Sequence, residues 1–291
     1  MSAIRQGRAR GRQFMRAALP LLAAALANAS AQAQPRTGAE TPPPAVSFAD
    51  MADLAEAAGI VALVEVRKQT LVPPARAPGV APGHARLYIE ARTAALLAGR
   101  SALGESLVYL ADVPVLPNGK PPKLKKQRFL VFADPVPGRP GSLQLVGTGA
   151  QLPATPQTEQ LARSVLAALA APQVPPRLTG VRDVMSVAGN LAGESETQLF
   201  LGTSSGAPAS LTVVRRPGME PEWGVSWSEI VDQAARPPAP ETIEWYRLAC
   251  FLPERLPADA FLQPDQASRR QAEADYRFIL DQLGDCRRLR A

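Results

Sequence analysis

Short apolar runs separated by proline and glycine follow one another through the first half of the chain. Five of them have the length and composition of β-strands: residues 59–66, 85–97, 106–111, 127–133 and 142–146. Residues 48–58 and 156–171 instead place apolar side chains at helical spacing, and Pro172 ends the second of these segments. Five short strands without long helices between them predict a small antiparallel barrel or sandwich over residues 48–171.

Strand-like runs return after a proline-rich linker at residues 172–176. Ser204-Ser205-Gly206 separates two of them as a hairpin turn. The predicted strands cover residues 178–187, 197–201, 209–214 and 223–227. Two helices, at residues 241–252 and 265–283, close the chain. We therefore expect a mixed α+β protein, mainly β, whose second domain (residues 177–291) combines a β-hairpin sheet with two helices.

Residues 1–33 have the three-part organisation of a secretory signal peptide. An arginine-rich stretch up to Arg16 precedes an apolar run at residues 17–27, and Ala31-Gln32-Ala33 provides a cleavage site. The apolar run is shorter than the roughly 20 residues that cross a bilayer. We expect a periplasmic or secreted protein with a proline-rich leader at residues 34–47 and no transmembrane segment in the mature chain.

Most of the net charge belongs to that signal segment. The chain has 32 Lys+Arg, 26 Asp+Glu and a net charge of +6. Five of the arginines and none of the acids lie in residues 1–33, which leaves 27 basic against 26 acidic residues. A nearly neutral mature chain lacks the overall charge of a phosphate-backbone binder, so we expect no nucleic-acid partner.

One local excess of positive charge remains. It consists of Lys120, Lys123, Lys125, Lys126 and Arg128. The sequence leaves two interpretations open: a loop that faces an anionic envelope surface, and an ordinary solvated hairpin loop. Lys123, Lys125 and Lys126 are therefore candidate binding residues.

The chain has two cysteines, Cys250 and Cys286. An oxidising compartment favours their pairing. They do not form a Cys-x-x-Cys motif, which argues against a redox-active pair. We predict a structural disulfide that joins the ends of the two C-terminal helices.

Residues able to carry out catalysis are scarce. His84, the single histidine, lies in a Gly/Pro loop, so neither a histidine-dependent triad nor a zinc site is expected. No phosphate- or dinucleotide-binding motif occurs, and we expect no metal and no cofactor. Glu194 and Glu196 alternate before a strand and, with Asp183, could perform general acid/base catalysis or bind Ca²⁺. The alternative is a solvated loop that leads into a hairpin.

Trp223 and Trp227 form the most prominent aromatic pair. Their spacing places both rings on one face of a predicted strand. The pair is either a stacking platform for a carbohydrate or other ligand, or part of the core of the second sheet.

Residues 48–170 resemble an OB-type barrel of the netrin-like kind. The resemblance rests on the element order, with Ile60–Val66 as the opening strand and Arg128-Phe129-Leu130-Val131-Phe132 as a late central strand. Netrin-like protease inhibitors depend on an N-terminal cysteine that contacts the protease metal. This chain has no cysteine before Cys250, so the resemblance implies the barrel without that activity. The second half resembles exported bacterial proteins in overall character.

These observations lead us to expect an exported, non-enzymatic binding or interaction protein whose partner is an envelope protein or ligand. This hypothesis predicts an exposed apolar or aromatic patch. One alternative is a carboxylate-dependent hydrolase, which predicts that Glu194 and Glu196 line a concave pocket beside Asp183. The other alternative is a structural component of an envelope assembly.

Overall fold

The computed structural model describes residues 46–228 and 236–290. The expected signal segment and the leader up to residue 45 lie outside the described residues. The described part contains α1 (Phe48–Ala57), β1 (Ile60–Leu71), the 3-10 turn η1 (Pro74–Arg76), β2 (His84–Gly99), β3 (Ser106–Pro114), β4 (Arg128–Pro135), β5 (Ser142–Leu145), β6 (Gln151–Pro153), α2 (Pro156–Leu169), β7 (Leu178–Ala188), β8 (Ser195–Thr203), β9 (Ala209–Arg215), β10 (Glu222–Ser226), α3 (Ile243–Ala249) and α4 (Gln266–Leu283). The predicted mixed α+β class, with strands predominating, is confirmed.

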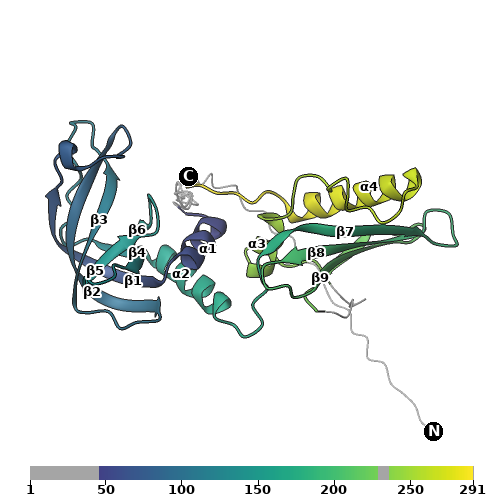
Figure 1. The fold of residues 1–291 in the computed structure, drawn as a ribbon, viewed down its shortest axis with the longest axis horizontal. Coiled ribbons are helices and arrows are strands. Elements are labelled where there is room, and N and C mark those ends of the chain that lie inside the picture. Colours follow the sequence, from purple (N-terminus) through teal and green to yellow (C-terminus); the bar gives the residue numbers. More distant parts are fainter. Residues whose placement is uncertain (1–45, 229–235, 291) are drawn as a thin grey trace, which may run out of the picture. The chain divides into compact units, whose positions relative to one another are not determined.

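Five strands close into a barrel in the order β1-β2-β3-β5-β4, because β4 pairs again with β1 (Figure 1). Neighbouring strands run antiparallel except at β3 and β5, which pair in parallel through Val108↔Ser142 and Tyr109↔Leu143. The short strand β6 extends the sheet beside β4. The predicted barrel is thus present and is closed, but it is not antiparallel throughout, because β3 and β5 pair in parallel.

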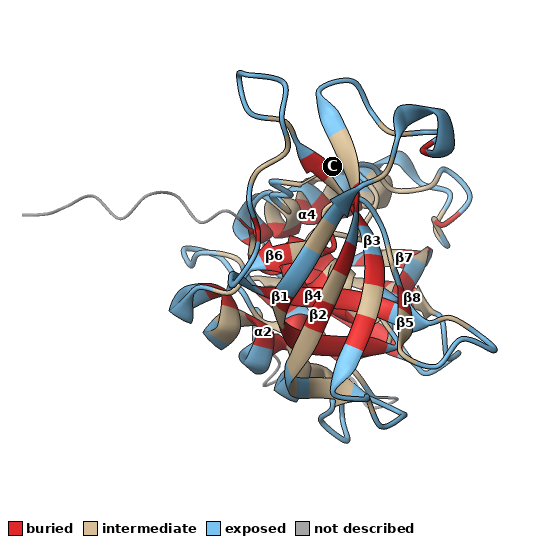
Figure 2. Cartoon of the chain, turned by 90° about the vertical axis from the view of Figure 1, so that its left-hand side faces the viewer, coloured by how far each residue is buried: buried red, intermediate tan, exposed pale blue. Residues whose placement is uncertain are grey.

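The barrel strands differ in how many of their faces are buried. Along residues 87–91 of β2 and along β3, buried side chains alternate with partly or fully exposed ones, as expected where one face meets solvent (Figure 2). In β4, Phe129 and Val131 point into the barrel, whereas Leu130 and Phe132 pack outside it in a second core. Burial on both faces explains why the β4 sequence is an unbroken apolar run.

The second core connects the barrel wall to the rest of the described chain. Side chains of β1 and β4 share one hydrophobic cluster with the helices α1 to α4 and the second sheet. Ser47 and Asp50 form a capping box at the start of α1, and Thr155 with Thr158 forms one at α2. These caps fix where the two helices begin against the barrel.

The second sheet has the antiparallel order β10-β9-β8-β7, and α4 packs on β7 and β8 (Figure 1). The segment around residues 260–263 covers the β7 edge. The side chain of Gln263 accepts from Ser186 N at 3.0 Å and donates to Ser186 O at 3.1 Å. One carboxamide therefore satisfies both backbone groups that a neighbouring strand would satisfy.

The predicted disulfide between Cys250 and Cys286 is present and joins the end of α3 to the segment after α4. The chain then returns to α1. Arg288 Nε donates to Asp53 at 2.7 Å, and the backbone of Leu289 donates to Asp50 at 3.0 Å. The acidic side of the first helix thereby holds the last described residues.

Glu56, one turn further along α1, accepts hydrogen bonds from Arg247 and Arg177. The Arg247 side chain is only 4% exposed and also donates to Pro175 O at 2.9 Å. Burial opposes ionisation of Glu56, but the two guanidinium groups outweigh it and hold the pKa of Glu56 below its ordinary value. The carboxylate is therefore a stabilising group at neutral pH.

Glu56→Gln is expected to lower the free energy of unfolding by about 2 kcal/mol at pH 7, because Arg247 loses its charged acceptor. Since the pKa of Glu56 is lower in the folded state, its contribution is present above the unfolded pKa of about 4.3 and is lost as the pH falls through the folded value. The difference between variant and wild type in urea unfolding should shrink below about pH 4. Glu273→Gln, at an exposed position of α4, is the matched control. An equal effect of both changes at all pH values would contradict this account.

Candidate functional site

The three candidate catalytic carboxylates do not gather at one place. Glu194 accepts from the backbone of Asn190 and Leu191 and so closes its own loop. Glu196 is exposed and accepts from Gln198. Asp183 pairs with its neighbour Arg182 on β7. The register partner of Glu196 on β7 is Val187, which lies four residues, or about 13 Å along the strand, from Asp183.

A hollow of about 510 Å³ lies near the β8–β9 turn, and Arg182 and Phe200 are among its lining residues. Neither Glu194 nor Glu196 lines it. His84 is exposed at the start of β2, where Nδ1 lies 3.2 Å from Pro82 O. The described residues contain no cluster of three or more His, Cys, Asp or Glu side chains that could hold a metal ion.

Both candidate tryptophans belong to the core of the second sheet. Trp223 is 6% exposed, and Trp227 packs partly buried against the same hydrophobic cluster. Both Nε1 atoms are buried without a hydrogen-bond partner in the described part of the chain. In this structure the Trp223 ring is not accessible for ligand stacking.

The basic run lies in the connection between β3 and β4, residues 115–127, which we call the lysine loop. Its backbone is bonded to β1: Lys126 N donates to Val66 O at 2.8 Å. Gln69 Nε2 donates to Pro122 O at 2.8 Å, and Gln69 Oε1 accepts from Leu124 N. The loop thus continues along β1 beyond the point where β4 pairs with it.

Leu124 fixes the lysine loop from inside. It is 5% exposed and belongs to the barrel core, whereas Lys123 and Lys125 on either side are exposed. Lys126 adopts a left-handed backbone conformation with φ of 68°. Such a residue persists only where its surroundings hold it, here through the backbone bond to Val66.

The charges of this loop have no ion-pair partner in the part of the chain that the structure describes. Among the described residues, Lys120, Lys123, Lys125 and Lys126 form no ion pair. Glu65, on the neighbouring strand, already pairs with Arg67 and Arg92. Four ammonium groups are therefore presented to solvent on a fixed backbone.

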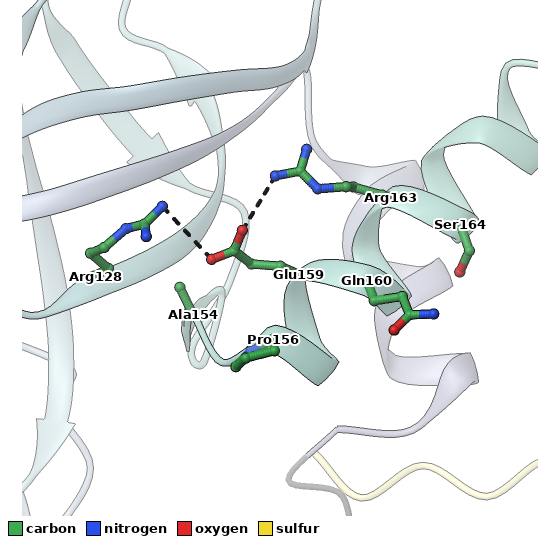
Figure 3. A pocket seen from close by; sticks show the side chains of 7 residues that line it. All are labelled: Arg128, Ala154, Pro156, Glu159, Gln160, Arg163 and Ser164. Atoms are coloured by element: carbon green, nitrogen blue, oxygen red, sulfur yellow. Dashed lines mark hydrogen bonds and ion pairs between the residues drawn. The ribbon is translucent and has the colours of Figure 1, made fainter.

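An open hollow of about 720 Å³ lies between the start of β4 and α2 (Figure 3). Glu159 lies between two guanidinium groups, at 3.8 Å from Arg128 and 3.3 Å from Arg163. One carboxylate against two guanidinium groups leaves the hollow with a net positive charge. Arg128 thus belongs to a network with α2, apart from the four unpaired lysines that precede it.

The outer side of β2 and β3 carries an exposed pair that our reading of the sequence missed. Tyr88 and Leu110 are register partners on adjacent strands and are 39% and 48% exposed. Alternation could have placed each of them outside, because Leu87 and Ile89 point inward. Their juxtaposition depends on the register between the strands, which no local signal specifies.

Ion pairs flank Tyr88 and Leu110, and we call this surface the β2–β3 face. Arg86 makes two hydrogen bonds to Asp112, at 2.7 and 2.8 Å. On the other side, Lys68 Nζ lies 2.9 Å from Glu90. The charges of the face are internally matched, and its centre is aromatic and aliphatic.

No protein-family model matches the chain, and no curated protein matches its sequence.

Proposed function

We propose that the protein is an exported, non-enzymatic binding protein of the cell envelope that recognises a protein partner through the β2–β3 face. The observation that carries the proposal is the exposed Tyr88–Leu110 pair between two ion pairs. An aromatic and aliphatic centre inside a polar rim is the usual anatomy of a protein interface. Tyrosine is also enriched among the residues that dominate binding energy.

The barrel topology supports the choice of this face. Its closed strand order is that expected of an OB-like barrel, the resemblance that the sequence indicated. In OB folds, the face formed by strands 2 and 3 and the adjoining loops binds oligonucleotides and oligosaccharides, so the barrel supports the location of the surface, and the Tyr88–Leu110 pair supports the protein class of the partner. Here Arg86 links the β1–β2 loop to this face by donating to Pro78 O at 3.2 Å. We also propose that the barrel of residues 48–170 is of the netrin-like kind, which its element order resembles.

Two features support export. The N-terminal 33 residues have the organisation of a signal peptide, and the cysteines are paired, as expected in an oxidising compartment. Among the described helices, none has the length and hydropathy needed to span a membrane.

Site-specific photocrosslinking in an exporting bacterial host tests the proposal. A photoreactive phenylalanine analogue at position 88 is expected to give a discrete crosslinked adduct, because the side chain there lies at the interface centre. Leu110→Ser should reduce this adduct about fivefold or more, as for loss of an interface residue worth over 1 kcal/mol. Leu110 is 48% exposed, so its replacement should change the unfolding free energy by less than about 0.5 kcal/mol.

Position 191 provides the control, because Leu191 is 61% exposed and lies in the β7–β8 loop. The same analogue at this position should give no discrete adduct. Identical adducts from positions 88 and 191, or an adduct at 88 that is unaffected by Leu110→Ser, would rule out the β2–β3 face as the binding surface.

A further inference from the structure

We propose that the lysine loop docks the protein on an anionic phospholipid bilayer, with lipid phosphates as the groups that the lysines contact. The proposal does not rest on the function proposed above. It is carried by three properties of the loop: its free charge, its fixed backbone and the apolar groups beside it.

The lysine loop holds four free positive charges within one short segment. Residues 34–291 have 27 basic and 26 acidic side chains, yet four lysines lie within residues 120–126. Their ammonium groups form no ion pair with described residues. A nearly neutral body with four free lysines in one loop is attracted to an anionic surface preferentially through that loop.

The fixed backbone lowers the entropic cost of docking. Leu124 is buried in the barrel, and the hydrogen bonds to Val66 and Gln69 hold the loop on both sides of it. The lysine side chains must still be ordered on binding, but the main chain is already in place.

The chemistry of the loop favours a bilayer over a discrete anionic ligand. Lysine is a flexible point charge, suited to many mobile phosphates, whereas bidentate recognition of one anion is the property of arginine. Leu116 is 46% exposed. A turn holds it beside the lysines: Leu116 N donates to Lys120 O, and Gly119 N donates to Leu116 O, both at 2.8 Å. An aliphatic side chain next to cations is the combination that enters the headgroup region.

The test is co-sedimentation with vesicles of phosphatidylcholine that contain about 30% phosphatidylglycerol, against vesicles of phosphatidylcholine alone. Wild-type protein, purified after export, should sediment only with the anionic vesicles and should be released by high salt. Each lysine near an anionic bilayer contributes about fivefold to binding. Lys120→Gln, Lys123→Gln, Lys125→Gln and Lys126→Gln together should weaken the partition coefficient at least about 100-fold.

A matched control removes the same amount of charge elsewhere. Arg100, Arg255, Arg270 and Arg277 are exposed and form no ion pair with described residues, so their joint change to glutamine alters the net charge equally. This variant should bind within about threefold of wild type. Thermal unfolding of both variants checks that the fold is retained, and all three proteins carry the same N terminus.

Three results would overturn the proposal. The first is wild-type protein that does not distinguish the two kinds of vesicle. The second is an equal loss of binding in both quadruple variants, which would make net charge alone responsible. The third is loop-dependent binding to a soluble sulfated polysaccharide without binding to anionic vesicles, which would identify a polyanion in place of a bilayer.

Discussion

Replacing Asp275 by alanine is expected to lower the free energy of unfolding by about 3 kcal/mol, which should be measurable in urea at neutral pH. Asp275 lies on α4 with no exposed surface. Its carboxylate accepts from Thr197, Arg215 and Gln271. Removing it leaves the Arg215 guanidinium group without its carboxylate partner and leaves Ser186 Oγ as the remaining acceptor of the buried Thr197 hydroxyl. The Arg215 side chain is 29% exposed and keeps part of its hydration, which places the effect at the lower end for a broken buried ion pair.

Asp281→Ala is the control on the same helix, because Asp281 is exposed. Its effect should stay below about 0.5 kcal/mol. Asp275→Asn keeps an acceptor of similar shape and should fall between the two. If Asp275→Ala were as stable as Asp281→Ala, the hydrogen bonds of Asp275 to its three partners would contribute nothing to stability.

Removing the disulfide is the second change with a large expected effect. Cys250→Ser with Cys286→Ser should lower the free energy of unfolding by about 3 to 4 kcal/mol, because the bridge closes a loop of 36 residues. For a chain of this size the midpoint of thermal unfolding should fall by about 10 °C. Differential scanning calorimetry in the absence of reductant measures this shift.

Dithiothreitol should give wild-type protein the stability of the double variant and leave the variant unchanged. Mass spectrometry of unreduced wild-type protein should find the bridged peptide. Two free thiols, or equal unfolding midpoints with and without reductant, would be incompatible with a stabilising bridge.

The sequence located most helices and strands because their signals are local. Ser47 and Thr155 mark helix starts, and alternation marks β7 to β9. β1 extends beyond the predicted residue 66 to Leu71, and residues 68–71 pair with β2 after a register shift at Arg67. The polar residues 67–70 end the apolar run, so the sequence did not indicate this extension. The three-residue strand β6 gave no periodic signal.

What could not be predicted depends on contacts between distant residues. The parallel pairing of β3 with β5 has no local signal, nor does the position of Asp275 against Arg215, 60 residues away in the chain. The lysine loop was identified by composition, but its rigidity comes from Gln69 and Leu124, which composition does not single out. The backbone partner of Glu194 likewise depends on the conformation of its loop, which the sequence does not specify.

The attachment of the C-terminal segment to α1 sets an order on folding. Arg288 and Asp53 are 235 residues apart in sequence. Asp50 accepts from the backbone N–H groups of the two residues after Arg288. The first helix therefore obtains these partners only when residues 288–290 are available. During synthesis from the N terminus, α1 is made long before these partners, and in that interval chaperones that bind unfolded polypeptides have access to the side of α1 that they later cover.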